Sequence, residues 1–132
     1  MNTAEMLNTY RRTVTEIDEL EHQLELATPT GRPNGIRGAG AREEGATNHG
    51  LAARMQLADG LAELIRVKRE QLAGLNGQVW QAMQQIANGR ELQVVQQYYL
   101  MGDTDDAIAM GMGLSKARVN QIRLGFVKRL GA

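Results

Sequence analysis

The stretch Ala107–Ile122, AIAMGMGLSKARVNQI, contains two glycines separated by a single methionine, inside a pattern that is otherwise typical of a helix. Glycine in a helix interior costs about 1 kcal/mol relative to alanine, so two glycines this close indicate a corner between two helices. Gly113 can adopt the positive φ that a corner requires, and Ser115 can cap the helix that follows. The stretch therefore predicts two helices joined by a tight turn.

The residues just before this stretch predict how the first of the two helices begins. Thr104 can cap a helix with its hydroxyl, and Asp105 and Asp106 would stand in the first turn, where negative charge is favourable to the helix dipole. The residues expected to face the core are Ile108, Ala109, Met112 and Leu114. A calcium loop would need a different spacing of acids and a closing glutamate, so we predict capping and no metal site.

The helix after the corner has two contrasting faces. Its apolar stripe consists of Val119, Ile122, Phe126 and Leu130. At about 100° per residue, the opposite face carries Ala117, Gln121, Leu124 and Lys128, with Asn120 beside them and Lys116 and Arg118 at the edges. An anchoring stripe opposite amide and cationic side chains is typical of a helix-turn-helix, in which the second helix reads base edges in the major groove.

Charge is distributed unevenly along the chain. The 15 basic and 15 acidic side chains give a formal net charge of zero, yet no acidic residue follows Asp106. The last stretch instead carries five cations, which are Lys116, Arg118, Arg123, Lys128 and Arg129. A polyanion such as DNA would therefore bind at this end of the chain.

Residues Thr104 to Leu130 resemble region four of bacterial sigma factors. The matching residues are Ile108-Ala109, Met112-Gly113-Leu114-Ser115, Arg118-Val119, Gln121-Ile122 and the basic pair before the last leucine, and Arg90-Glu91-Leu92 and Tyr98-Tyr99 match the lead-in helix. The resemblance covers about residues 90–131, and no counterpart of sigma region two is found. It implies a helix-turn-helix whose second helix binds promoter DNA. The layout of the whole chain is similar to small phage-encoded sigma-like transcriptional regulators.

The resemblance and the two-faced helix together predict a set of DNA-binding residues. The set is Ser115, Lys116, Ala117, Arg118, Asn120, Gln121, Arg123, Leu124, Lys128 and Arg129. Ala117 and Arg123 depart from the residues usual in the family. The alanine methyl can touch thymine but cannot accept a hydrogen bond from cytosine, so the −35 promoter element is not assumed to be the target.

The first two thirds of the chain predict two long helices. Apolar or neutral residues at alternating spacings of four and three begin at Met6 and end before Thr28-Pro29, which indicates a helix over about residues 3–27. Both prolines and six glycines fall in 28–50, which indicates a loop, with Arg32, Arg37 and Arg42 as a basic tether in one interpretation. A second stripe runs from Leu51 through Met55 to Val79. Trp80, Met83 and Ile86 extend it to a predicted stop at Asn88-Gly89.

Composition favours an all-α protein, because good helix formers dominate and aromatic and β-branched residues are few. We predict two regions. Residues 1–89 form a helical hairpin or a dimerising coiled coil, and residues 90–132 form the helix-turn-helix. The chain has no cysteine, no grouping typical of a catalytic site and no phosphate-binding loop, so we expect no enzyme activity and no cofactor. It also lacks a signal peptide and a membrane span, which predicts a cytoplasmic protein of a bacterial host cell.

These features predict a sequence-specific, DNA-binding transcriptional regulator. Double-stranded DNA is the expected ligand, a homodimer the expected assembly and host RNA polymerase a further expected partner. Two alternatives use the same helix. One is a phage inhibitor or interaction protein that binds a host protein through the helix-turn-helix fold, and the other is a small terminase subunit.

Overall fold

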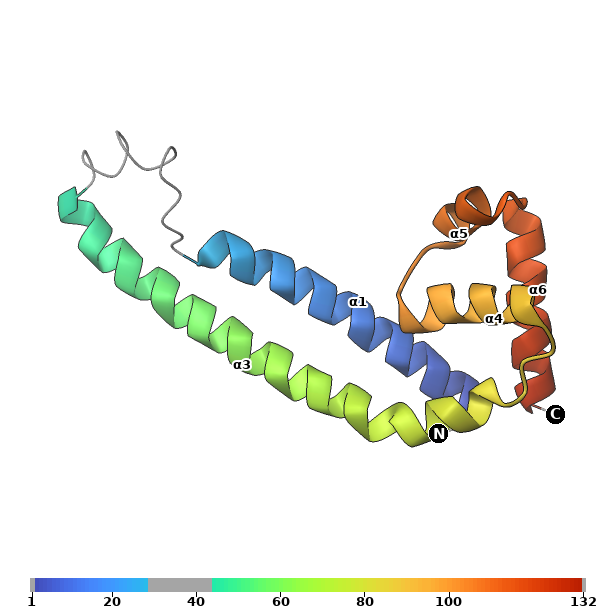
Figure 1. Ribbon diagram of the computed structural model, residues 1–132. Helices are drawn as coiled ribbons and strands as arrows, with labels where there is room; N and C mark the ends of the chain where they lie inside the picture. The colour runs from blue at the N-terminus through green and yellow to red at the C-terminus, as the bar shows by residue number, and fades with distance from the viewer. Residues whose placement is uncertain (1, 29–43, 132) are drawn as a thin grey trace. The chain divides into compact units, whose positions relative to one another are not determined.

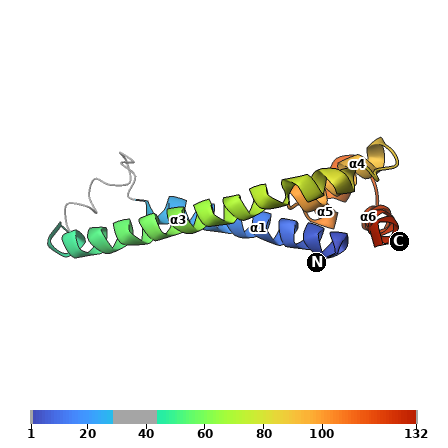
Figure 2. The same cartoon turned by 90° about the horizontal axis from the view of Figure 1, so that it is seen from below.

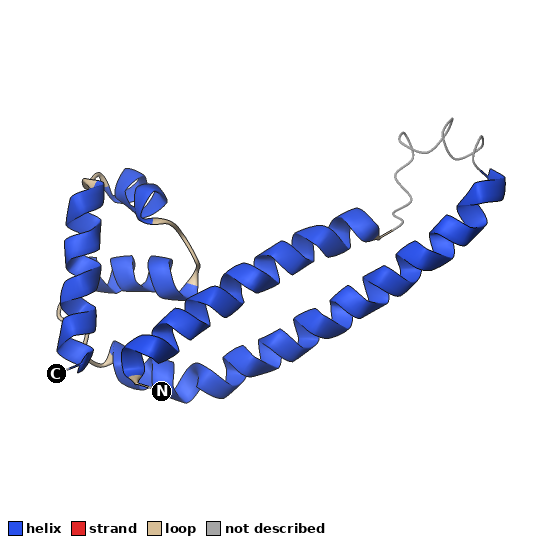
Figure 3. Cartoon of the chain, turned by 180° about the vertical axis from the view of Figure 1, so that it is seen from behind, coloured by secondary structure: helices blue, strands red, loops and turns tan. Residues whose placement is uncertain are grey.

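The computed structural model describes residues 2–28 and 44–131, and within these the side chains of 2–28 and 50–131. All regular structure in these ranges is helical, which confirms the predicted all-α class (Figure 3). The contacts divide the chain into two units, one of Met1–Glu16 with Arg69–Ala132 and the other of Ile17–Lys68. Among the described helices, none combines the length and the apolar character needed to cross a membrane.

The long helices α1 (Thr3–Ala27) and α3 (Glu44–Met83) form an antiparallel helical hairpin (Figures 1 and 2). The predicted bounds of α1 are confirmed. The predicted loop over 28–50 was wrong at its end, because α3 begins at Glu44. Extending an existing helix adds a hydrogen bond per residue, which offsets the cost of weak helix formers such as Gly45. The tether arginines of the loop lie outside the described residues.

In the unit Ile17–Lys68, each long helix buries one face. The buried residues are Ile17, Ala27, Leu61 and Ile65. All four occupy the heptad-like positions expected to pack between the helices, and Ala27 is the last of them in α1. Met55, expected on the same face of α3, is instead 52% exposed.

The main core lies in the unit that contains the C-terminal helices. It joins the start of α1 to the end of α3 and to the helices that follow, through Met6, Leu7, Val79, Ala82, Val95, Tyr99 and Phe126. Trp80, predicted to continue the buried face of α3, is 68% exposed. Trp80 is one residue, about 100° of rotation, from the buried Val79, and Ala82 fills the inward position in its place.

Asn88 begins a helix and does not end one, so the predicted stop was wrong. The long helix α3 already ends at Met83, and α4 (Gly89–Val95) begins after Asn88. The Asn88 side chain accepts a hydrogen bond from the Glu91 amide at 2.9 Å, and the Glu91 carboxylate accepts one from the Ala87 amide at 3.0 Å. Asparagine is favoured at both ends of helices, and here it caps an N-terminus while Glu91, three residues later, binds the amide of the residue before the cap.

The lead-in helix ends in a π-helical turn, η1 (Gln96–Leu100), followed by a tight connection. Gly102 has φ of 79°, and a Cβ at this position would lie 3.2 Å from Cγ2 of Thr15 in α1. Arg11, also in α1, donates hydrogen bonds to the carbonyls of Tyr98 at 2.7 Å and Asp103 at 3.0 Å. The N-terminal helix therefore holds the link that precedes α5.

The predicted corner is confirmed. Helix α5 (Asp105–Met112) begins at Thr104, whose hydroxyl accepts a hydrogen bond from the Ala107 amide, and it ends at Gly113 with φ of 68°. Helix α6 (Lys116–Gly131) follows, and the Ser115 hydroxyl accepts from the Arg118 amide at 3.0 Å. A small core joins α4, α5 and α6 through Val94, Ile108, Ala109 and Val119.

Candidate nucleic-acid interface

The rotation of α6 is fixed by its apolar stripe. Val119 and Phe126 are fully buried, Ile122 and Leu130 are partly buried, and α6 packs against α4 and α5. Phe126 enters the main core and Val119 the small core. Because an apolar stripe sets which way the remaining side chains point, the opposite face of α6 is directed away from the core.

Most of the predicted DNA-binding residues are exposed, either on α6 or directly before it. The exposed members of the predicted set are Ser115, Lys116, Ala117, Arg118, Gln121, Leu124, Lys128 and Arg129. Gln121 can donate and accept hydrogen bonds, as recognition of a base edge requires. Leu124 is 51% exposed and adds an apolar contact surface to the same face.

Asn120 and Arg123 point instead toward the start of α5. Arg123 Nη2 donates to Asp105 Oδ2 at 2.9 Å, and Asn120 Nδ2 donates to the same oxygen at 3.4 Å. Burial raises the pKa of Asp105, but the hydrogen bonds from Arg123 and Asn120 outweigh burial and hold the pKa below its usual range. The structure therefore places these two residues in the junction between α5 and α6.

A stacked cluster supports the same junction. The guanidinium carbons of Arg11 and Arg123 lie 3.9 and 4.0 Å from the centre of the Tyr98 ring. A guanidinium that stacks on an aromatic ring is attracted to the electron-rich ring face. Its N–H groups, which point outward in the guanidinium plane, can still donate hydrogen bonds. Tyr98 thus links α1 to α6, and Arg123 is held by both a carboxylate and a ring.

Arg129 is also engaged within its own chain. Its guanidinium donates to the carboxylate of Glu91, which is 6% exposed, and to the carbonyl of Gln85 at 2.8 Å. The hydrogen bond from Arg129, opposed by burial, lowers the pKa of Glu91. A buried carboxylate needs such a partner, so Arg129 fastens the end of α6 to the start of α4.

The cationic end of the chain is thus partly neutralised in the fold. Lys116 Nζ lies 3.7 Å from Asp106 Oδ2, with both side chains exposed, and Arg123 and Arg129 have the acidic partners described above. Within the part of the chain that the structure describes, Arg118 and Lys128 form no ion pair. The linear count of five cations therefore overstates the charge that α6 presents to a ligand.

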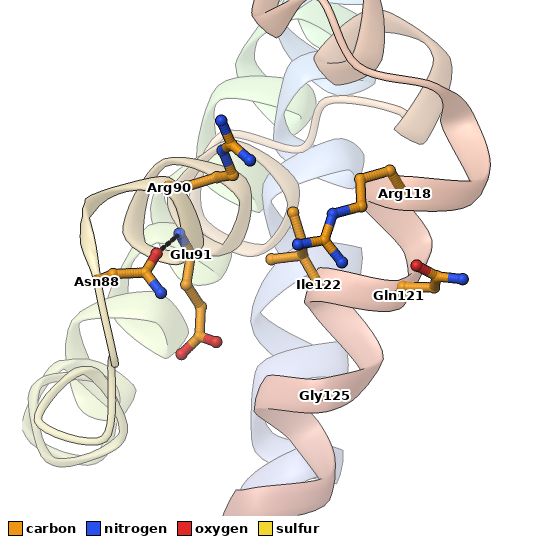
Figure 4. Close-up of a pocket in the computed structure, with 7 residues that line it drawn as sticks. All are labelled: Asn88, Arg90, Glu91, Arg118, Gln121, Ile122 and Gly125. Atoms are coloured by element: carbon orange, nitrogen blue, oxygen red, sulfur yellow. Dashed lines mark hydrogen bonds between the residues drawn. The ribbon is translucent and has the colours of Figure 1, made fainter.

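A groove between α4 and α6 contains Arg90, a cation outside the predicted DNA-binding set. Its volume is about 410 Å³, and its lining residues are Asn88, Arg90, Glu91, Arg118, Gln121, Ile122 and Gly125 (Figure 4). Arg90 is exposed and forms no ion pair within the described residues, so two guanidinium groups, of Arg90 and Arg118, line one groove. Gly125 has no side chain, so the α6 side of the groove is open at this position. No local pattern in the sequence marks Arg90 for this role, because the groove forms only where α4 packs against α6.

This arrangement suits contact with a polyanion that also offers base edges. Two arginines can bind phosphate oxygens, each with two parallel N–H donors, while Gln121 and Leu124 lie on the adjoining face of α6. The described residues contain no group of three or more side chains that could hold a metal ion. Comparisons of the chain with models of protein families, with curated proteins and with solved structures find no match.

Proposed function

We propose that this chain is a sequence-specific regulator of transcription that binds double-stranded DNA with α6 in the major groove. One observation carries the proposal: Gln121, Leu124 and Lys128 are exposed on the face of α6 opposite the buried Val119 and Phe126. A helix about 10–12 Å across with such a free polar face has the dimensions that a major groove accepts. The resemblance of residues 104–130 to sigma region four supports the same assignment.

The proposed contacts divide into two classes. Gln121 and Leu124, with Ala117 one turn earlier, are the proposed readers of base edges, because amide and apolar groups distinguish bases. Arg90, Arg118 and Lys128 are the proposed phosphate contacts, because they are exposed and form no ion pair within the described part of the chain. Asn120, Arg123 and Arg129 are proposed to position α6 through their contacts within the fold.

Selection of bound fragments from random duplex DNA at two salt concentrations tests the proposal. We expect a defined consensus at both, and an affinity that falls steeply with salt, since each phosphate contact releases a counterion. Recovery of unselected sequence at both salt concentrations would contradict sequence-specific binding. A Gln121→Ala variant should lose discrimination at one base-pair position and keep its affinity for unrelated DNA.

A second candidate function is favoured by two exposed apolar side chains. Met110 on α5 is 86% exposed and Leu124 on α6 is 51% exposed, as in a module that binds a host protein such as RNA polymerase. Binding through apolar area depends weakly on salt, in contrast to binding of phosphates. Leu124→Ser with Met110→Ser separates the candidates, because it should abolish protein capture while leaving the affinity for unrelated DNA unchanged.

We propose that the protein binds DNA as a homodimer. One helix-turn-helix buries little surface on DNA, and two copies double the contact area and read two half-sites. A consensus with two related half-sites in the selection experiment is the expected sign of this assembly. A single asymmetric site occupied by one chain would contradict it.

A further inference from the structure

Helix α3 carries a second apolar stripe on a face distinct from its buried one. In the unit Ile17–Lys68, Leu61 and Ile65 are buried, whereas Leu57 and Leu64 are 55% and 43% exposed. With Ala53, Gly60 and Val67, these two leucines recur at spacings of four, three, four and three residues. Helical geometry places this second stripe about 100° around the helix from the buried one. The pattern is the seam of a coiled coil that lacks its partner.

Gly60 lies in the middle of this stripe, over open space. A Cβ at Gly60 would meet no atom within 4 Å. A second helix can therefore approach closely here, with the two leucines as knobs on either side. The apolar seam is about two heptads long, so its area suits a partner bound with modest affinity.

The charges beside the stripe select the partner and its direction. With the exposed leucines at heptad position a and Gly60 and Val67 at d, Glu63 falls at g and Lys68 at e. In a parallel pair of identical helices in register, position g lies beside position e of the other helix, five residues later. Glu63 of each copy then lies beside Lys68 of the other. Lys68 already has an interaction within its own chain, and the carboxylate of the second copy would share that lysine. An antiparallel pair would instead bring acid beside acid, which is unfavourable.

We propose that a second copy of this chain covers the stripe, parallel and in register over residues 53–67. The inference deepens the homodimer of the proposed function by assigning its surface. Glu63 already pairs with Arg66 at 2.6 Å, but both side chains are more than half exposed, so exchange for a partner across the dimer costs little. Identical helices paired in parallel and in register are related by a twofold axis, which matches the symmetry of two related half-sites.

Disulfide trapping tests the register, because the chain has no cysteine of its own. Ala53→Cys and Gly60→Cys place a thiol at two d positions, and Ala62→Cys, on the opposite side of α3, is the matched control. On mild oxidation, both d variants should form disulfide-linked dimers and the control should stay monomeric, since a disulfide needs Cα atoms about 4.4–6.8 Å apart. An antiparallel pair would link at most one of the two positions, and that result, or no link at either, would overturn the proposal.

Sedimentation equilibrium tests the surface itself. The unmodified chain should convert from monomer to dimer between about 5 and 100 µM, as expected of a seam this short. Leu57→Glu with Leu64→Glu should remain monomeric, while Met55→Glu with Met110→Glu, which alters exposed apolar residues off the stripe, should dimerise like the parent. Circular dichroism shows whether each variant keeps its helix content.

A parent that stays monomeric up to 100 µM, or a control that dissociates as fully as the stripe variant, would overturn the proposal. Neither experiment contains DNA. A dimer that binds no DNA would therefore overturn the proposed function alone, whereas a monomer that binds DNA would overturn the dimer surface alone.

Discussion

Arg123 reaches back from α6 to Asp105 in the first turn of α5, with Nη2 of the arginine 2.9 Å from Oδ2 of the carboxylate. Both side chains are only 12% exposed. Asp105 thus serves two purposes, since it stands where the helix dipole favours an acid and it also receives the guanidinium that stacks on Tyr98. The pair fixes the angle between the two helices of the corner.

Asp105→Ala should destabilise the fold by about 2 kcal/mol, because it leaves Arg123 poorly solvated and without its carboxylate. Asp106→Ala is the matched control. Asp106 is the next residue, and its contact with Lys116 at 3.7 Å joins two exposed side chains, so its loss should change stability by less than about 0.5 kcal/mol. Urea unfolding followed by circular dichroism measures both. Equal losses in the two variants would show that the dipole, and not the ion pair, is what matters.

Acid should weaken the fold through two carboxylates whose pKa values are lowered. Asp105 and Glu91 both have pKa values below the ordinary 3.8 and 4.5, so the unfolded chain binds more protons than the folded chain near these values. Their contribution is complete above the unfolded pKa values and is lost as pH falls through the folded ones. The free energy of unfolding should therefore decline from about pH 5.5 to about pH 3.

The matched variant for the pH experiment is Asp105→Asn with Glu91→Gln, which removes both titrations and keeps the side-chain shapes. Its unfolding free energy should be lower near neutral pH and should vary less with pH over the same range. A slope as steep as that of the parent would assign the acid sensitivity to other groups.

The corner was predictable from the sequence because its signals are local. Gly113 can take positive φ, Thr104 and Ser115 can cap, and each acts on residues within four positions in the chain. The α1 bounds were predictable for the same reason, since the heptad-like spacing begins at Met6 and proline follows Thr28. Local chemistry of this kind needs no knowledge of the tertiary fold.

What the sequence could not supply depends on residues far apart in the chain. The partners of Arg123, Arg129 and Lys116 are acids that lie 10 to 38 positions earlier, so a count of charges by segment cannot show their neutralisation. Likewise, the side of α3 that faces the core near Trp80 is set by where α4 and α6 pack against this helix. Arg90 was missed because its relevance arises from the groove it shares with Arg118.

Gly102→Ala should lower the stability of the fold by more than the cost of a positive φ alone. Alanine in this left-handed conformation costs about 1 kcal/mol, and its Cβ would also lie 3.2 Å from Cγ2 of Thr15. Thr15→Ser removes that methyl, so the double variant should recover part of the loss. Gly113→Ala, which has a positive φ and no neighbour within 4 Å, should show the cost of φ alone. Thermal unfolding measures all four proteins, and no recovery in the double variant would mean that the Thr15 contact is relieved by movement of α1.

The two arginines of the groove should act on DNA affinity and not on sequence preference. Arg90→Gln and Arg118→Gln each remove a proposed phosphate contact, so each should lower the slope of log affinity against log salt by about 1. Gln121→Ala should leave that slope unchanged and instead relax the preference at one base pair by about 1–3 kcal/mol. Fluorescence anisotropy with the selected site and with a scrambled duplex, over a series of salt concentrations, measures both quantities.

Arg12→Gln is the matched control for this experiment. Arg12 is exposed on α1 and belongs neither to the groove nor to α6. Its replacement by glutamine therefore removes one positive charge and leaves the proposed interface unchanged. If all three arginine variants lower the salt slope equally, the affinity for DNA depends on the net charge of the protein, and the two arginines of the groove are not specific phosphate contacts. If Arg90→Gln alone leaves the slope unchanged, the phosphate path runs along α6 and does not cross to α4.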